Sequence, residues 1–253
     1  MRFASLGSGS KGNATVVDCG KSRFLVDCGF SIRETERRLQ RLELTPADIS
    51  AVLVTHEHTD HLRGVLPLAK KYNIQVVMTA GTSKVLKSPH ASLTLIDSHS
   101  PFECDGVTIT PVSVPHDARE PVQYIFSSHG LRLGVLTDIG SITSHVVDEY
   151  SGCDGLLLEC NHDLQMLLSG TYPQALKQRI SSPWGHLSND QSLALLESLD
   201  LRRMQHLVVG HISQQNNALD IVQELMQEID SRLPSVHYAC QEEGFDWLEL
   251  KAS

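Results

Sequence analysis

The 253-residue sequence has few cysteines, no long apolar run and a deficit of positive charge. Its six cysteines stand singly, without the CxxC pairs that are typical of zinc ribbons and redox motifs. No apolar run reaches the roughly 18 residues of a membrane helix, and the N-terminus lacks the apolar core of a secretory signal. We therefore expect a cytoplasmic protein with reduced thiols and no membrane segment.

Acidic residues outnumber basic ones by 30 to 21, which gives a net charge of −9. This balance argues against a generally basic coat for nucleic acid, yet it is compatible with a local basic strip beside a site that binds phosphate through metals. With 41% hydrophobic and 20% charged residues, the chain can bury the core of one large domain over residues 1–253. The sequence carries no repeat, no long linker and no signal for an oligomeric state.

The densest group of potential metal ligands is His56, His58, Asp60 and His61, which directly follows the apolar run 51–54. In an extended segment His56 and His58 point to the same side, and Asp60 and His61 follow as the chain turns into a helix expected over 64–72. Imidazole and carboxylate groups suit zinc, manganese or iron, and their density here is sufficient for two ions. The alternative interpretation is a cluster of surface histidines.

Four further apolar segments end at a carboxylate or an imidazole. The expected strands 23–26, 107–114, 131–137 and 205–209 are followed at or near their ends by Asp27, His116, Asp138 and His211. From chemistry alone, Asp27 could equally be a turn former, and a lone histidine such as His116 is usually incidental. Their repeated position at strand ends favours one common site at the edge of a sheet.

The N-terminal loop spells GxGxxG through Gly7, Gly9 and Gly12. A dinucleotide site requires a helix directly afterwards, but residues 14–19 contain Thr and Val and favour a strand. We therefore expect a glycine turn between antiparallel strands, whose backbone N–H groups could still face a phosphate.

Periodicity predicts the other elements of the chain. In the expected helix 31–42, the apolar side chains point inward and Arg33, Arg37, Arg38 and Arg41 face solvent, either as a solvated face or as a nucleic-acid contact. Ser188 or Asn189 is expected to cap a helix over 190–199, and Asn216 and Asn217 to begin or cap a helix over 218–233 with Ile221, Leu225, Ile229 and Leu233 inward. We also expect a short helix over 83–87, a hairpin of 122–127 with 131–137, and strands over 2–6, 74–79, 93–104, 155–162, 236–240 and 245–250.

The HxHxDH stretch, together with the other strand-end residues, resembles the metallo-beta-lactamase superfamily. The resemblance implies an α/β fold, the αββα four-layer sandwich, with a dinuclear metal site at one rim. It also implies that Asp27 orients the histidine loop and that Asp138 bridges the two ions. The implied ligands are His56, His58, His116 and Asp138 for one ion, and Asp60, His61, Asp138 and His211 for the other.

Three segments, GSGSKGN, GHLSN and GHISQQNN, are most similar to the YycJ (WalJ) group, which is related to RNase Z. This resemblance implies a metal-dependent phosphodiesterase, a 5′-to-3′ exonuclease that acts on DNA in preference to RNA. Asp60 would steer or accept the proton of the attacking water, and His186, beside Glu159, would protonate the leaving oxygen. His186 could instead be a loop histidine without chemistry. The alternative functions are a thioester hydrolase of the glyoxalase II type and a non-catalytic, metal-bound DNA-binding module.

Overall fold

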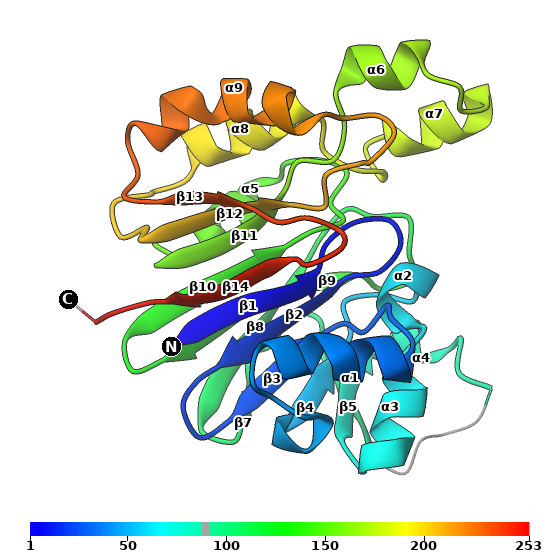
Figure 1. Cartoon of the computed structure of the whole chain (residues 1–253), viewed down its shortest axis with the longest axis vertical. Helices are drawn as coiled ribbons and strands as arrows, with labels where there is room; N and C mark the ends of the chain where they lie inside the picture. Colours follow the sequence, from blue (N-terminus) through cyan, green and yellow to red (C-terminus); the bar gives the residue numbers. More distant parts are fainter. Residues whose placement is uncertain (88–91, 253) are drawn as a thin grey trace.

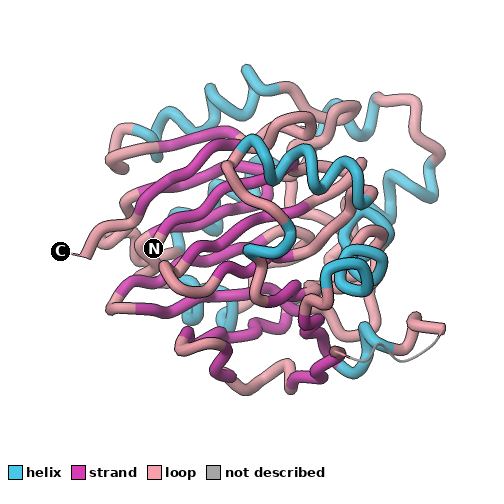
Figure 2. Tube along the Cα trace, turned by 60° about the horizontal axis from the view of Figure 1, so that its bottom comes forward, coloured by secondary structure: helices cyan, strands magenta, loops and turns pink. Residues whose placement is uncertain are grey.

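The computed structural model describes residues 1–87 and 92–252. Two seven-stranded sheets face each other, and helices cover the outer side of each sheet (Figure 1). This arrangement confirms the predicted αββα four-layer sandwich. Figure 2 shows the strands stacked in the middle of the molecule and the helices at its periphery.

The first sheet comes from the N-terminal part of the chain and one strand from the C-terminus. Strands β1, β2 and β3 run antiparallel, whereas β3, β4, β5 and β6 run parallel. The β1–β2 connection is the glycine turn that the sequence predicted. The strand order is β14 (Phe245–Glu249), β1 (Arg2–Gly7), β2 (Ala14–Asp18), β3 (Arg23–Val26), β4 (Ala51–Leu53), β5 (Gln75–Thr79) and β6 (Leu93–Ile96).

The second sheet contains the predicted hairpin, β9 with β10. Strands β10 to β13 run parallel, so that their carboxyl ends lie at one edge of the sheet. The strand order is β13 (Val236–Tyr238), β12 (His206–Gly210), β11 (Gly155–Glu159), β10 (Leu131–Leu136), β9 (Val122–Ser128), β8 (Val107–Ser113) and β7 (Phe102–Cys104).

Helices flank both sheets and form one projecting hairpin. The first sheet is covered by α1 (Ile32–Arg41), the 3-10 turn η1 (Pro46–Asp48), α2 (Thr59–Leu62), α3 (Val65–Tyr72) and α4 (Ala80–Ser83). The second sheet is covered by α5 (Ser144–Tyr150), α8 (Asn189–Ser198) and α9 (Leu219–Asp230). Helices α6 (Leu164–Ser169) and α7 (Gln174–Ile180) project beyond the sheets at the upper right of Figure 1.

The apolar core has three parts, as four layers require. One part lies between the sheets, where the rings of Phe24 on β3 and Phe126 on β9 are 5.6 Å apart. The second lies under α1 and α3 and includes Leu39 and Leu68. The third lies under α5, α8 and α9 and includes Tyr150. Among the described residues, no helix combines the length and the apolar character needed to cross a membrane.

Two predicted helix positions were wrong. The helix expected over 83–87 lies earlier, at α4, because the Thr79 hydroxyl accepts a hydrogen bond from the Thr82 N–H and starts the helix there. The N-cap position of α9 is occupied by Ala218, which forms no side-chain cap, and not by Asn216 or Asn217 as expected. The Asn217 side chain instead donates to the Cys160 carbonyl oxygen and to Asn189 inside the protein. The expected cap at Ser188 is confirmed, with its hydroxyl accepting from the Gln191 N–H.

Two predicted helix faces also need correction. On α9, Ile229 is buried as predicted, and Leu225 and Leu233 pack against the core while partly buried. The face is nevertheless rotated, because Val222 and Met226 are fully buried and Ile221 is only half-buried. On α1 the Arg38 side chain is 11% exposed. Its guanidinium lies 4.1 Å from the Phe30 ring and donates to two backbone carbonyl oxygens. Arg41 likewise donates to the Ser5 carbonyl oxygen at 2.8 Å. Arg38 is therefore packed against the N-terminal strand rather than facing solvent, whereas Arg41 is exposed as predicted and also binds that strand.

Candidate active site

Several strands end at one rim with an acidic residue or a histidine. Three of these residues have left-handed backbone conformations, with φ of 61° at Asp27 and 52° at both Asp138 and His211. Such conformations are uncommon for residues other than glycine and cost about 1–3 kcal/mol each. Their presence at three strand ends shows that tertiary contacts hold these side chains in place.

The structure brings all seven predicted ligand residues together. Ligand atoms of His56, His58 and His116 lie within 4.8 Å of one another, and so do those of Asp60, His61 and His211. Two overlapping groups meet the same distance, one of His56, His61 and Asp138 and one of Asp138, Glu159, His186 and His211. Asp138 lies between the two groups. Its Oδ2 is 3.2 Å from His61 Nε2 and 3.3 Å from His211 Nδ1, and its Oδ1 is 3.9 Å from His116 Nε2.

Hydrogen bonds on the outer side orient three imidazoles and fix the tautomers of His56 and His116. The Asp27 carboxylate accepts from the Thr55 hydroxyl at 2.7 Å and from His61 Nδ1 at 2.8 Å. Because the Thr55 hydroxyl has donated its hydrogen, His56 Nδ1, 2.9 Å away, must donate to it. His116 Nδ1 donates to the Gly185 carbonyl oxygen at 2.9 Å. Nε2 of His56 and of His116 therefore presents a lone pair, as metal binding requires. Burial alone would lower the pKa of His61, but Asp138 and Asp27 raise it well above its ordinary value, so this ring would release its Nε2 proton on binding a metal.

Two atoms at the centre of the cluster lack a hydrogen-bond partner within the described part of the chain, His56 Nε2 and Asp138 Oδ2. Both are buried, and leaving a buried acceptor without a partner costs about 1–3 kcal/mol. Burial lowers the pKa of His56 well below its ordinary value, so that the ring is neutral. Burial alone would raise the pKa of Asp138, but His211 and His61 lower it well below its usual range. A neutral imidazole and a carboxylate facing one centre fit a divalent cation.

Glu159, at the end of β11, connects the rim to His186. Its Oε2 is 2.9 Å from both His186 Nδ1 and His211 Nδ1, and its Oε1 accepts from the Leu187 N–H at 2.9 Å. The carboxylate also accepts from the Asp138 N–H at 3.0 Å. Burial alone would raise the pKa of Glu159, but His186 lowers it, and Glu159 in turn raises the pKa of His186 against the effect of burial. The pair is thus a carboxylate with a protonated imidazole.

Sequence reasoning did not single out the side chains that support this rim. The Ser8 hydroxyl accepts from the His211 N–H at 2.8 Å, and Asn13 Nδ2 lies 3.1 Å from His61 Nε2. Both come from the glycine turn, whose sequence suggested backbone donors but gave no sign of side-chain contacts.

Asp117, directly after His116, also escaped notice. Its carboxylate is 3.4 Å from His116 Nε2 and 3.7 Å from His58 Nε2, and it accepts a hydrogen bond from Arg179 on α7. No sequence pattern links Arg179 to the metal loop, because the contact depends on where the α6–α7 hairpin lies.

An open cleft of about 450 Å³ gives access to the rim. Among the ligand residues, the side chains of His58 and Asp60 are 26% exposed, whereas the other five are buried. The side chain of His186 is 20% exposed. Water and substrate can therefore reach Asp60 and His186 from the cleft. The rest of the lining comes from Ser10 and from residues of the projecting hairpin, Tyr172, Leu176, Arg179 and Ile180.

Comparison with known proteins agrees with this geometry. Residues 22–212 match the family described as Beta-lactamase superfamily domain. The chain is 30% identical over 234 residues to the exodeoxyribonuclease YycJ of Bacillus anthracis, covering 90% of this chain and 89% of the relative. It is 34% identical over 234 residues to the exodeoxyribonuclease WalJ of Streptococcus pneumoniae serotype 2 (strain D39 / NCTC 7466), covering 89% and 87%.

The solved structures add the fold. The structure of Zn²⁺-bound PqqB from Methylobacterium extorquens superposes with a TM-score of 0.77 at 18% identity, covering 99% of this chain and 100% of that chain. The histidine and carboxylate groups at the rim are those that hold metal ions in hydrolases. The chain therefore belongs to the metallo-beta-lactamase superfamily, as a metal-dependent hydrolase of the group that contains YycJ and WalJ.

Proposed function

We propose that the protein is a phosphodiesterase with two divalent metal ions that hydrolyses DNA in the 5′-to-3′ direction. The observation that carries the proposal is that possible ligand atoms gather in overlapping groups on both sides of Asp138, one with His56, His58 and His116 and one with Asp60, His61 and His211. His56, His58, His116 and Asp138 would hold one ion, and Asp60, His61, Asp138 and His211 the other. Zinc and manganese both suit these donors, and iron is compatible with them.

Two such ions supply a water of lowered pKa and neutralise the charge that develops on a phosphate under attack. Asp60 is suited to steer or accept the proton of that water, because its carboxylate is partly exposed in the cleft and 3.5 Å from His61 Nε2. Its proposed role thus combines metal binding with proton transfer.

His186 would protonate the leaving oxygen. It is partly exposed in the same cleft, and its hydrogen bond to Glu159 fixes the ring and favours the charged imidazole. A protonated imidazole beside the substrate can donate to the alkoxide that departs from phosphorus. Glu159 acts through His186 and is therefore a positioning residue.

The choice of nucleic acid as substrate rests on the relatives, which are named exodeoxyribonucleases. The cleft can admit a phosphate chain, because Arg179 and Ser10 of the N-terminal loop line it together with the ligand residues. The cytoplasm is the compartment that we propose, and the six cysteine thiols, all free, fit its reducing conditions.

The experiment is digestion of 5′-labelled and 3′-labelled DNA and RNA, single-stranded and duplex, with manganese and with zinc. We expect the 5′ label to be released at once as a mononucleotide and the 3′-labelled strand to shorten gradually, with no products from Asp60→Ala. Hydrolysis of S-lactoylglutathione but not of bis(p-nitrophenyl) phosphate would favour the thioester hydrolase instead. DNA binding without turnover under either metal would favour the non-catalytic module.

A further inference from the structure

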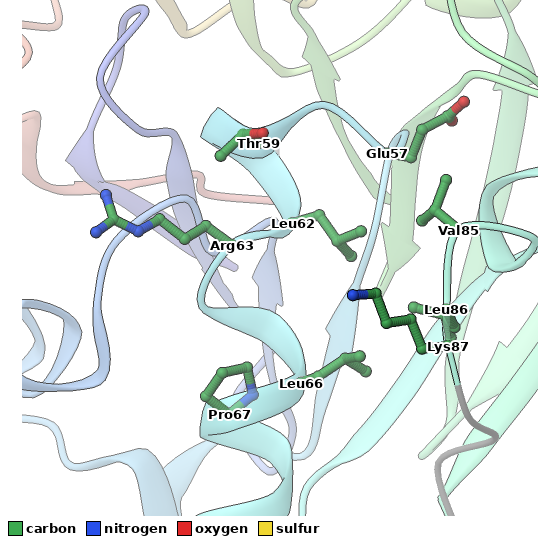
Figure 3. Close-up of a pocket in the computed structure, with 9 residues that line it drawn as sticks. All are labelled: Glu57, Thr59, Leu62, Arg63, Leu66, Pro67, Val85, Leu86 and Lys87. Atoms are coloured by element: carbon green, nitrogen blue, oxygen red, sulfur yellow. The ribbon is translucent and has the colours of Figure 1, made fainter.

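A second cavity, of about 370 Å³, adjoins the catalytic cleft. Its volume lies in the range of about 300–1,000 Å³ that is usual for small-molecule sites. Glu57 and Thr59 line both this cavity and the cleft, so the two are neighbours at the metal loop. Figure 3 shows that one side of the pocket comes from α2 and α3 and the other from the segment after α4.

The floor of the pocket is aliphatic. Leu62, Leu66 and Pro67 contribute from α2 and α3, and Val85 and Leu86 face them from the other side. Val85 is 39% exposed, so this apolar surface is accessible from solvent. Aliphatic side chains form no hydrogen bonds. They can pack against a flat apolar group such as the face of a nucleobase, and this contact does not distinguish one base from another.

Two cations belong to the lining, Lys87 over the floor and Arg63 at its edge. In Figure 3 Lys87 extends its ammonium group toward Leu62 and Leu66, and Arg63 extends on the far side of the helix. Within residues 1–87 and 92–252, neither side chain forms an ion pair. The remaining charged residue of the lining, Glu57, accepts from the Arg119 N–H at 3.0 Å and lies 3.8 Å from the Arg119 Nε. The lining is therefore net positive in a chain of net charge −9.

We propose that this pocket holds the nucleotide next to the scissile phosphate, with its base on the aliphatic floor and its flanking phosphates near Arg63 and Lys87. The inference rests on the proposed function, because it assumes a polynucleotide whose scissile phosphate lies at the metal rim. A strand that leaves the rim over Thr59 would reach the pocket next, since Thr59 lines both cavities. Phosphate contacts and an aliphatic base contact together predict binding that is independent of sequence.

The test compares two double variants of the manganese-loaded protein on a long single-stranded oligothymidylate. Arg63→Ala/Lys87→Ala should raise KM about tenfold and leave kcat unchanged, because only positioning contacts are lost. The slope of log KM against log salt should fall by about 1.4, which is about 0.7 for each phosphate contact with a single strand. The matched control is Lys70→Ala/Lys84→Ala, which removes the same charge from exposed positions on α3 and at the end of α4, outside the pocket.

A second pair of variants tests the base contact. Leu66→Glu places a negative charge on the floor, and Leu95→Glu places the same charge on an exposed leucine of β6. In the wild type, a strand with one abasic nucleotide should have a KM about fivefold higher or more when that nucleotide lies next to the scissile phosphate, and an unchanged KM when it lies elsewhere. Leu66→Glu should abolish that position dependence, and Leu95→Glu should retain it.

The outcomes separate this inference from the proposed function. Hydrolysis of bis(p-nitrophenyl) phosphate, which is too small to occupy the pocket, should be unchanged in all these variants. An equal rise of KM in the pocket variant and in its control, or a loss of bis(p-nitrophenyl) phosphate hydrolysis in the pocket variant alone, would overturn the subsite. Failure of the wild type to cleave any phosphodiester would instead contradict the proposed function.

Discussion

Replacement of His186 by alanine should slow the cleavage of DNA far more than the cleavage of an activated ester. In the structure, His186 Nδ1 lies 2.9 Å from Glu159 Oε2, and its side chain is 20% exposed in the cleft. The leaving group in DNA is a deoxyribose alkoxide, which needs a proton. The leaving group in p-nitrophenyl thymidine phosphate is p-nitrophenolate, a stable anion that needs none.

The expected loss can be bounded from general acid catalysis, which contributes about 10²–10⁴-fold. Because the position of His186 is open to the cleft, water can replace the lost imidazole, and we expect a decrease in kcat of about 10²-fold on DNA. On the p-nitrophenyl ester the decrease should be about threefold or less, since no proton transfer to the leaving group is required. Both metals should remain, because Glu159 still accepts from His211 and from the Leu187 N–H.

The assay measures kcat on both substrates for wild type, His186→Ala and Glu159→Gln, together with metal content. Glu159→Gln keeps the size of the side chain but removes the charge that favours the protonated imidazole, so it should show the same leaving-group dependence in weaker form. His129→Ala, at an exposed position of the β9–β10 turn, is the control and should change nothing. Equal losses on both substrates, or loss of a metal from His186→Ala, would refute the reasoning.

Two further variants address the metal loop. Asp60→Ala should abolish turnover while leaving the circular dichroism spectrum and the melting temperature nearly unchanged. The Asp60 side chain is partly exposed, and its contact with Asn13 Nδ2 is long, at 3.4 Å. Measurable DNA hydrolysis by this variant would exclude a role of Asp60 in the reaction. Asp27→Asn should weaken metal affinity about 10–100-fold, because an amide cannot accept from both His61 Nδ1 and the Thr55 backbone and hydroxyl as the carboxylate does. Competition with a chelator measures this affinity, and an unchanged value would show that Asp27 does not orient the ligands.

Most strand positions were predictable from the sequence because apolar runs such as residues 51–54 are buried on both faces of a sheet. The strand expected over 93–104 was wrong, because it is two short, half-exposed strands, β6 and β7, that belong to different sheets. Helices were harder to predict. Helices α5, α6 and α7 are six or seven residues long, too short for a clear apolar period, and α6 leaves Leu164 and Leu168 exposed. Arg38 was placed in solvent because its contacts are with backbone carbonyl groups, which no side-chain pattern records.

The candidate site was more predictable than the fold around it, because its ligand residues stand at strand ends, where the sequence shows an abrupt change from apolar to polar. The structure brings these residues together, and it places Glu159 beside His186 as the resemblance implied. Supporting contacts such as Ser8 with His211 could not be predicted, since they join positions 203 residues apart. Long-range contacts of this kind follow from strand order, not from local pattern.

The most direct test of the central claim is the number and position of bound metal ions. Elemental analysis of the manganese-loaded protein, combined with anomalous diffraction from its crystals, should find two ions for each chain, about 3.5–4 Å apart. We expect Asp138 to contact both ions, with His56, His58 and His116 around one and Asp60, His61 and His211 around the other. A single ion, or two ions of which neither contacts Asp138, would contradict the account.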